Sequence, residues 1–592
     1  MKKIFNNSLI IFFVLMMSCD DLLNVTPGSE MTDSGFWKSE NDLKGACNRM
    51  YQQFTSDSHD TRADDQVGGS PNKISTGQRT VQDASEADWK DPYDRIFLAN
   101  NIIEKAADAS VTPAVRDRYI GEAMFFRAWY HFDLMMKYGD VPLVTKVFKS
   151  GSDPDLNMGR TPREDVVQQC YKDLEFAAEA LPAFSAWTTT DEFDRRRVTR
   201  SAALALIVRI ALYEGTFQKY HAINGGSNAK AHISKAISAF EQLRGEGHTL
   251  YSTSSGKLQP YQAQFFDESQ ITNKELIFGK AYGPNGGSGS GYTNHNYTGD
   301  SEGSYMVTRK MLDMFLYADG LPVEKTSLRI ENETSFNNVA GLDRTGAILA
   351  DGKGQRDPRL LMSIWTILDP LENDATYGWL GAGKGDYLPF RSNSAATTAY
   401  HLKKRFKGSL WGAGKDFTDV IIIRWGEMLI SYAEALYENN GSITDAQLDE
   451  TVNALRTRAG FNARLTNAFA SANGLNMLEE IRRERNVELL AENLRYPDLL
   501  RWKTAETELP KAIIGGKFVG EEGGSVQDIT RLTGSDGKSN GETIMTGNIQ
   551  QNVFVIEYPS TRTFDPARDY YYPIPPYELV HSDNNIKQNP KW

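Results

Sequence analysis

Residues 422–458 read IIRWGEMLISYAEALYENNGSITDAQLDETVNALRTR, and they carry the clearest architectural signal in the chain. The spacing of their apolar residues predicts one helix over residues 422–438 and a second over residues 445–458. Residues 439–441 are Asn-Asn-Gly, a sequence that favours the end of a helix. We therefore predict two antiparallel helices here, and a mainly α fold.

The same periodicity occurs earlier in the chain. It predicts helices over residues 118–138, from Pro162 to about Leu181, from Thr199 onward, and over residues 231–243. Antiparallel pairs of this kind, with small residues between them, resemble tetratricopeptide units whose period is broken by insertions. We predict a right-handed, tetratricopeptide-type helical repeat scaffold with long loop-rich inserts.

The composition predicts a globular protein that does not bind nucleic acid. The chain has 592 residues, of which 40% are hydrophobic and 24% charged, which is ample for a core. Its 77 acidic and 65 basic residues give a formal net charge of -12, and the scattered basic residues would not attract a phosphate backbone. The 26 Tyr, 28 Phe and 10 Trp could offer flat faces to sugars or peptides, although most are expected in the core.

The first residues have the form of a lipoprotein signal peptide. Lys2 and Lys3 precede an apolar stretch over residues 9–17, which is too short to span a bilayer. Ser18 and Cys19 follow, as at a bacterial lipobox, where the cysteine sulfur receives the lipid. We predict that residues 1–18 are removed and that lipidated Cys19 anchors the mature protein stably, because it would carry several acyl chains.

Two cysteines remain after the anchor. Cys47 and Cys170 are far apart in the sequence and do not form a disulfide framework. We predict that both are buried thiols.

Short motifs follow one another along the whole chain. In the N-terminal half they are Leu22-Leu23-Asn24, Phe36-Trp37, Met50-Tyr51, Trp89 with Tyr93 and Asn100-Asn101, and Tyr138-Gly139-Asp140-Val141-Pro142-Leu143. In the C-terminal half they are Asp357-Pro358-Arg359-Leu360, Arg424 with Glu427, Tyr432-Ala433-Glu434-Ala435, Glu484-Arg485, Arg501-Trp502 and Tyr572-Pro573-Ile574-Pro575. In this order they resemble the SusD/RagB family of outer-membrane nutrient-binding lipoproteins. Two departures are Ala491-Glu492-Asn493, where Phe-Glu-Gly is usual in the family, and Lys591, where glycine is usual.

The resemblance implies a SusD-like fold in which residues 19–592 form a single domain. An N-terminal part of about 20–330 would hold repeat helices, an insert would span about 270–420, and a C-terminal repeat with a closing segment would span about 420–592.

The resemblance also implies a function and a location. The protein would be a non-catalytic lipoprotein without a cofactor, which binds a glycan and delivers it to a SusC-like TonB-dependent transporter. Asp20 and Asp21, directly after the anchor, are similar to the signal that sends Bacteroidetes lipoproteins to the cell surface. We expect an outer-membrane protein that faces the exterior.

The family places its ligand site on loops at one face of the scaffold. In this sequence those loops hold polar and aromatic side chains, which could bond sugar hydroxyls and lie against a pyranose ring. The candidates are Asp64, Asp65, Asn72, Arg79, Tyr282, Tyr292, Asn294, Tyr297, Trp365, Trp379 and Tyr387. Trp89 belongs to a core motif, so we interpret it as structural.

A surface glycoside hydrolase is a competing hypothesis, since it would also expose aromatics around two carboxylates about 5–10 Å apart. Adjacent Asp64 and Asp65 do not settle this question. The sequence shows no nucleophile elbow or phosphate loop, and its eight histidines include no pair at metal-ligand spacing on a helix. Residues 484–501 contain arginine and glutamate at helical spacing. Such pairs more often fix the packing of helices than take part in catalysis, so we interpret these charges as structural. We therefore predict neither catalytic residues nor a metal site.

Two other hypotheses keep the same fold. RagB-type relatives are associated with peptide uptake, and aromatic loops could equally hold a peptide. The protein could also act as a structural lid on its transporter, with little affinity of its own. The sequence does not choose among these.

Overall fold

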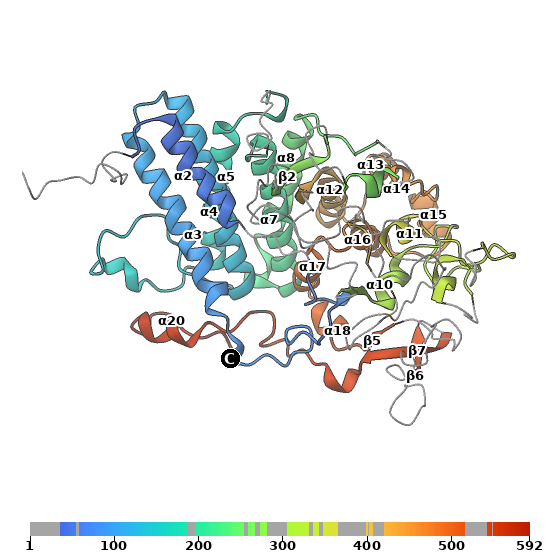
Figure 1. Ribbon diagram of the computed structural model, residues 1–592. Helices are drawn as coiled ribbons and strands as arrows, with labels where there is room; N and C mark the ends of the chain where they lie inside the picture. Colours follow the sequence, from blue (N-terminus) through green and yellow to red (C-terminus); the bar gives the residue numbers. More distant parts are fainter. Residues whose placement is uncertain are drawn as a thin grey trace, which may run out of the picture.

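The computed structural model describes residues 36–54, 59–186, 196–253, 259–266, 273–280, 305–330, 336–342, 347–364, 398, 400, 402–405, 419–515, 541–546 and 549–592. The long helices of this part form a series in which each packs against the next. They are α2 (Glu40–Gln53), α3 (Glu86–Lys105), α4 (Pro113–Tyr138), α5 (Arg163–Ala180), α7 (Arg200–His221), α8 (Ala229–Arg244), α12 (Trp425–Asn440) and α16 (Met477–Glu488). Figure 1 shows this series crossing the molecule from the blue helices to the orange ones.

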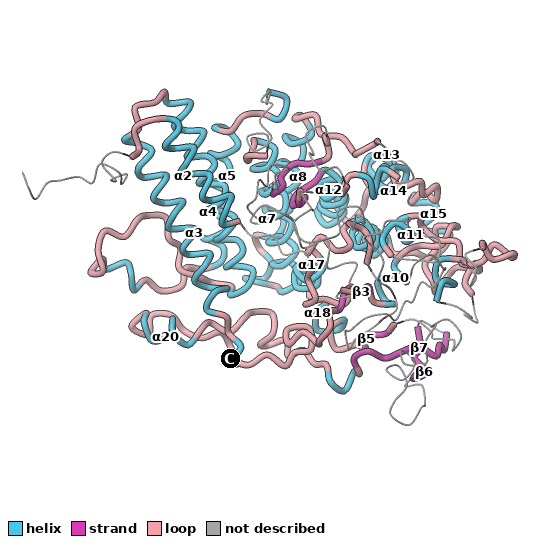
Figure 2. The backbone as a smooth tube through the Cα atoms, viewed as in Figure 1, coloured by secondary structure: helices cyan, strands magenta, loops and turns pink. Residues whose placement is uncertain are grey.

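Short helices and strands surround the series, and Figure 2 shows how little of the body is strand. The short helices are α9 (Pro260–Ala263), α10 (Arg309–Met314), α11 (Arg359–Ser363), α13 (Asp445–Glu450), α14 (Val452–Arg458), α15 (Asn467–Ala472), α17 (Arg495–Arg501), α18 (Ala505–Glu508) and α20 (Pro576–His581). The antiparallel strand pairings are β1 (Gln66–Val67) with β3 (Met306–Val307), β2 (Leu276–Lys280) with β4 (Val420–Arg424), and β7 (Ile549–Glu557) with both β5 (Ile513–Ile514) and β6 (Gly541–Thr546). The predicted mainly α fold is confirmed.

Local capping explains why the predicted helices begin and end where they do. The Thr199 hydroxyl accepts a hydrogen bond from the backbone of Ala202 and starts α7, while Pro162 precedes the first residue of α5. Gly441 follows α12 with a φ of 72°, a left-handed conformation that glycine adopts at little cost. The predictions for α4, α5, α7, α8 and the end of α12 are confirmed.

The prediction that a helix begins at residue 422 is wrong. Residues 420–424 form β4, which pairs with β2, and the helix starts at Trp425. Ile421, Ile422 and Ile423 are β-branched and pack well on a pleated strand. The partner strand lies far away in the sequence, so the local pattern does not reveal it.

The second helix of the same pair is interrupted. Thr451 has a φ of -119° and a ψ of -91°, which separates α13 from α14. Its hydroxyl donates to the backbone oxygen of Gln447 at 2.6 Å. This local hydrogen bond competes with continuation of the helix. The predicted single helix over residues 445–458 is therefore wrong.

One hydrophobic core extends from α2 to the C-terminal segment. It includes Trp89, whose ring centroid lies 4.8 Å from that of Tyr138, so its predicted structural role is confirmed. Cys47 and Cys170 are free and buried, and each thiol donates to a backbone oxygen, as predicted. No helix in the described part of the chain is both long and apolar enough to cross a membrane.

The C-terminal segment returns to the N-terminal helices. Figure 1 shows it running below α3 and ending there. The Arg160 guanidinium donates to the Asn589 side chain at 2.7 Å, and the Asn589 amide donates to the backbone oxygens of Tyr138 and Tyr572. Hydrogen bonds therefore hold the C-terminal segment against the end of α4 and the segment that follows it.

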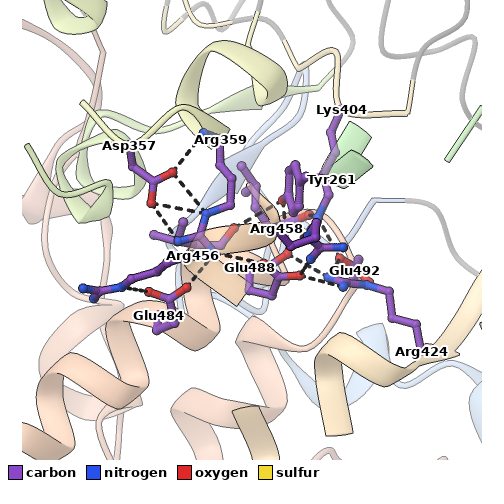
Figure 3. Close-up of polar contacts among 12 residues, drawn as sticks. Tyr261, Asp357, Arg359, Lys404, Arg424, Arg456, Arg458, Glu484, Glu488 and Glu492 are labelled. Atoms are coloured by element: carbon purple, nitrogen blue, oxygen red, sulfur yellow. Dashed lines mark hydrogen bonds and ion pairs between the residues drawn. The ribbon is translucent and has the colours of Figure 1, made fainter. Parts of the chain in front are cut away.

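A buried cluster of ion pairs, which we call the ion-pair cluster, joins segments of the C-terminal half (Figure 3). Its cations and anions are Arg359, Lys404, Arg424, Arg456 and Arg458, and Glu275, Asp357, Glu484, Glu488 and Glu492. At its centre, the Glu488 carboxylate accepts from Arg424 at 2.7 Å, from Arg359 at 2.9 Å and from Arg458. The packing role predicted for the charges within residues 484–501 is confirmed.

The turn after α16 connects the ion-pair cluster to the next segment. Ala491 and Asn493 have φ values of 62° and 63°, in the left-handed region, and Asn493 is one of the two positions where family resemblance makes glycine usual. The turn directs Glu492 inward, where it accepts from Arg424 and Lys404 at 2.7 Å. Burial lowers the pKa of Lys404 to about 8.

Candidate functional site

A cavity of about 710 Å³ lies between the N-terminal helices and the C-terminal half. One wall comes from α3, α4 and α7, which contribute both polar and apolar side chains. The opposite wall comes from β4 and from residues 492–501, directly after the ion-pair cluster. The lining also includes Phe54, residues 59–62, Asn72, Tyr305, Arg405, Ser431 and Arg485. The size is in the usual range for small-ligand pockets.

The cavity lining carries flat aromatic surfaces. The rings of His59 and Tyr305 stack at 3.9 Å with an interplanar angle of 17°. Trp129 of α4 is half-buried, and its ring lies 5.1 Å from that of Phe54, edge to face. Such rings have an apolar face and a polar edge, which suits the ring of a sugar or a planar peptide group.

Polar groups of α3 and α4 lie beside these rings. Lys137 lies 3.3 Å from Asp88 and 3.1 Å from Asp133. Burial opposes the charge of Lys137, but Asp133 and Asp88 outweigh it and raise the Lys137 pKa. Asp91, one turn further along α3, has a side chain that is 50% exposed. These groups can bond hydroxyl or amide groups of a ligand.

The loop over residues 59–62 is fixed to the C-terminal segment. The Arg62 guanidinium donates to the Asp60 carboxylate at 2.8 and 2.7 Å, and to the Tyr572 hydroxyl at 2.8 Å. The same guanidinium lies 4.7 Å above the Tyr496 ring. The loop is therefore held rigidly before any ligand arrives.

The C-terminal wall is also built from paired charges. Asp498 accepts from Arg485 at 2.6 Å and from Arg501 at 2.8 Å. Arg501 in turn donates twice to the buried Glu434, at 2.6 and 2.7 Å, which lowers the Glu434 pKa to about 2 despite its burial. These ions hold the wall in place.

Of the four predicted ligand contacts that are described, only Asn72 lines the cavity. Its amide donates to the Thr61 hydroxyl at 3.1 Å, and its oxygen accepts from the backbone of Ile74 at 2.9 Å. Part of its hydrogen-bonding capacity therefore supports the loop.

Asp64, Asp65 and Arg79 are buried, and none of them lines the cavity. Asp64 accepts from Arg495 at 2.7 and 2.9 Å and from Lys310, and these cations lower its pKa well below the usual range despite its burial. The Arg79 guanidinium stacks 3.7 Å above a tyrosine ring of the C-terminal segment. Asp65 is 4% exposed, and its Oδ1 has no hydrogen-bond partner among the described residues.

The remaining predicted residues lie outside the described part of the chain. They are Cys19, Tyr282, Tyr292, Asn294, Tyr297, Trp365, Trp379 and Tyr387. Their roles stay predictions.

The sequence reasoning missed the residues that α3 and α4 contribute. Trp129, Asp133 and Lys137 recur every four residues, which places them on one face of α4. Asp91 and Arg95 have the same spacing on α3. The sequence did contain a signal for these residues, namely a row of polar side chains along one face of a helix that is otherwise buried.

Comparison with known proteins identifies the family. A family model described as the SusD family matches residues 269–592, which is more than half of the chain. The chain belongs to the SusD family. A second model, described as "Starch-binding associating with outer membrane", matches residues 30–212 of this SusD family member.

Curated SusD-like proteins are similar over most of their length. SusD-like protein P38 of Formosa agariphila is 26% identical over 534 residues, covering 85% of this chain and 93% of the relative. SusD-like protein P2 of the same species is 24% identical, covering 100% of both chains.

Solved structures show the same fold. A SusD-like protein from Bacteroides fragilis matches with a TM-score of 0.69 at 21% identity, covering 95% of this chain and 99% of that one. A laminarin-binding SusD-like protein matches with a TM-score of 0.56 at 18% identity, covering 94% and 100%.

Proposed function

We propose that this SusD family member is a cell-surface lipoprotein that binds a glycan in the cavity and passes it to a SusC-like TonB-dependent transporter. The observation that carries the proposal is the cavity lining, which contains both stacked rings and half-exposed carboxylates. An aromatic face covers the apolar side of a pyranose, and carboxylates accept hydrogen bonds from its hydroxyls.

Relatives support a glycan as the ligand. One solved structure with the same fold is named for binding laminarin, and another, from Bacteroides fragilis, is described as a SusD-like carbohydrate binding protein. The model matching residues 30–212 is described by starch binding and the outer membrane. A peptide remains the second candidate, because the flat rings would also accept peptide groups.

The lipid anchor and the partner rest on the sequence and the family. The signal-like residues 1–18, followed by Cys19, support an anchor. Family membership supports a SusC-like barrel as the partner, with this protein closing over it to trap ligand. Several acyl chains on one cysteine would keep the protein at the outer membrane.

The charges of the cavity wall support binding without catalysis. A glycoside hydrolase needs a carboxylic acid that stays protonated beside the ligand. Asp60, Glu492 and Asp498 on the wall are each ion-paired with arginine, which favours a packing role over one as a proton donor. Burial and neighbouring Asp64 raise the pKa of Asp65 to about 7, but Asp65 does not line the cavity.

Calorimetric titration against polysaccharides, oligosaccharides and peptides, with product analysis of each mixture, tests the proposal. We expect saturable binding of at least one glycan and no new reducing ends. Cleavage would contradict the proposal and favour a hydrolase. Binding of peptides alone would favour peptide uptake, and binding of nothing would favour a structural lid.

A further inference from the structure

Arg95 differs in its pairing from three other cations on the cavity wall, Lys137, Arg62 and Arg209. Lys137 is shared between two carboxylates, Arg62 is fully engaged by Asp60 and Tyr572, and Arg209 donates twice to Glu427 at 2.8 and 2.7 Å. Arg95 forms one ion pair among the described residues, with Asp91 at 3.9 Å. That distance is beyond hydrogen-bonding range, so the donors of the guanidinium remain available.

The acidic neighbour does not neutralise Arg95 effectively. The Asp91 side chain is 50% exposed, so water screens its attraction, and a pair of this kind contributes little. The Arg95 side chain itself is only 15% exposed. It is therefore a largely buried cation on the wall of a cavity, without a hydrogen-bonded anion among the described residues.

Tyr130 adds a second donor at the same place. The guanidinium carbon of Arg95 lies 5.4 Å from the centre of its ring. Tyr130 is 5% exposed and lines the cavity, and its hydroxyl has no hydrogen-bond partner among the described residues. A buried hydroxyl without a partner is costly, and a ligand oxygen would remove that cost.

A second cation lies near these donors. Lys280 of β2 donates to the backbone oxygen of Phe54, which also lines the cavity. Burial and the charge of Arg95 both lower the Lys280 pKa. The chain has a net charge of -12, and Asp91 lies on the same wall, so recognition of an anion there would depend on these nearby cations.

We propose that Arg95 and the Tyr130 hydroxyl form a subsite for the acidic substituent of a glycan, the carboxylate of a uronic acid or a sulfate ester. This inference rests on the proposed function and narrows its substrate class. Both groups present several acceptor oxygens, and arginine binds them with two parallel donors. A neutral sugar hydroxyl would engage the same residues more weakly.

The test is calorimetric titration of a galacturonic acid trimer and its methyl ester, and of a sulfated galactan oligosaccharide and its desulfated form. The proteins are wild type, Arg95→Gln, Tyr130→Phe and a control, Arg116→Gln. Arg116 lies on α4 with a 38% exposed side chain and does not line the cavity. The two acidic ligands distinguish a carboxylate from a sulfate as the preferred group.

We expect at least one acidic ligand to bind more tightly than its neutral form, and Arg95→Gln to weaken it at least tenfold. Tyr130→Phe should weaken it a few-fold, and it keeps the fold because the hydroxyl it removes has no partner among the described residues. Arg116→Gln should change nothing. Equal affinity for acidic and neutral forms in wild type would overturn this inference and leave the proposed function standing. Absence of binding to every glycan would overturn both.

Discussion

Glu488→Gln should lower the free energy of unfolding by about 3–5 kcal/mol, and the protein should fold poorly at 37 °C. Glutamine keeps the shape of the side chain but removes the negative charge that Arg359, Arg424 and Arg458 share. The ion-pair cluster would then hold one uncompensated positive charge in a buried site. Urea unfolding followed by circular dichroism measures the change.

Glu479→Gln on the same helix is the matched control. Glu479 is exposed in the first turn of α16, so its loss should cost no more than about 0.5 kcal/mol. Equal destabilisation by the two substitutions would contradict the importance of the ion-pair cluster.

Lowering the pH should also remove stability that the ion-pair cluster contributes. Although burial opposes it, Arg424 and Lys404 lower the Glu492 pKa from 4.5 to about 2. A carboxyl whose folded pKa is lowered contributes stability above its unfolded pKa, and that contribution is lost as pH falls from 4.5 to 2.

The adjacent carboxyls Asp64 and Asp65 should respond in opposite directions to removal of charge. Asp64→Asn should destabilise the protein by about 3–5 kcal/mol, because Arg495 and Lys310 lose their buried partner. Asp65→Asn should stabilise the protein by ~1 kcal/mol or more at pH 8, since it removes a poorly compensated buried charge. Denaturant unfolding of both variants at pH 5 and pH 8 tests the pair.

The sign of the pH effect at Asp65 follows from its raised pKa. The folded carboxyl titrates at about 7 and the unfolded one at about 3.8, so the folded state binds more protons between these values. Stability contributed by this group therefore falls as pH rises from about 4 to 7, and Asp65→Asn should flatten the slope. Two results would contradict this account of Asp65. One is lower stability of Asp65→Asn at pH 8, and the other is unchanged stability together with weaker ligand binding.

The helical scaffold could be predicted because its signals are local. Thr199 and Pro162 mark helix starts, and Gly441 marks an end, within a few residues of the helices that they bound. The strand over residues 420–424 could not be predicted in this way. Its stability comes from pairing with residues 276–280, and the local sequence carries no record of that partner.

The site was harder to predict because distant segments build it. Family resemblance led to the loop that holds Asn72, which does line the cavity. The same stretch of the chain holds Asp64 and Asp65, on the other side of β1, and both side chains are buried. Asp64 pairs with Arg495 there. The sequence alone does not distinguish a carboxylate that binds a ligand from one that forms an ion pair with Arg495.

The most direct test of the central claim compares two stacked tyrosine and histidine pairs. Tyr305 stacks on His59 in the cavity, while Tyr577 of α20 stacks on His581 at 3.7 Å, is 53% exposed and does not line the cavity. The measurement is calorimetric titration of one glycan that binds wild type into Tyr305→Ala and Tyr577→Ala. We expect Tyr305→Ala to lose at least a factor of ~10 in affinity, about 1.4 kcal/mol, and Tyr577→Ala to bind as wild type does. Unchanged affinity in Tyr305→Ala, or loss only in Tyr577→Ala, would contradict the cavity as the glycan site.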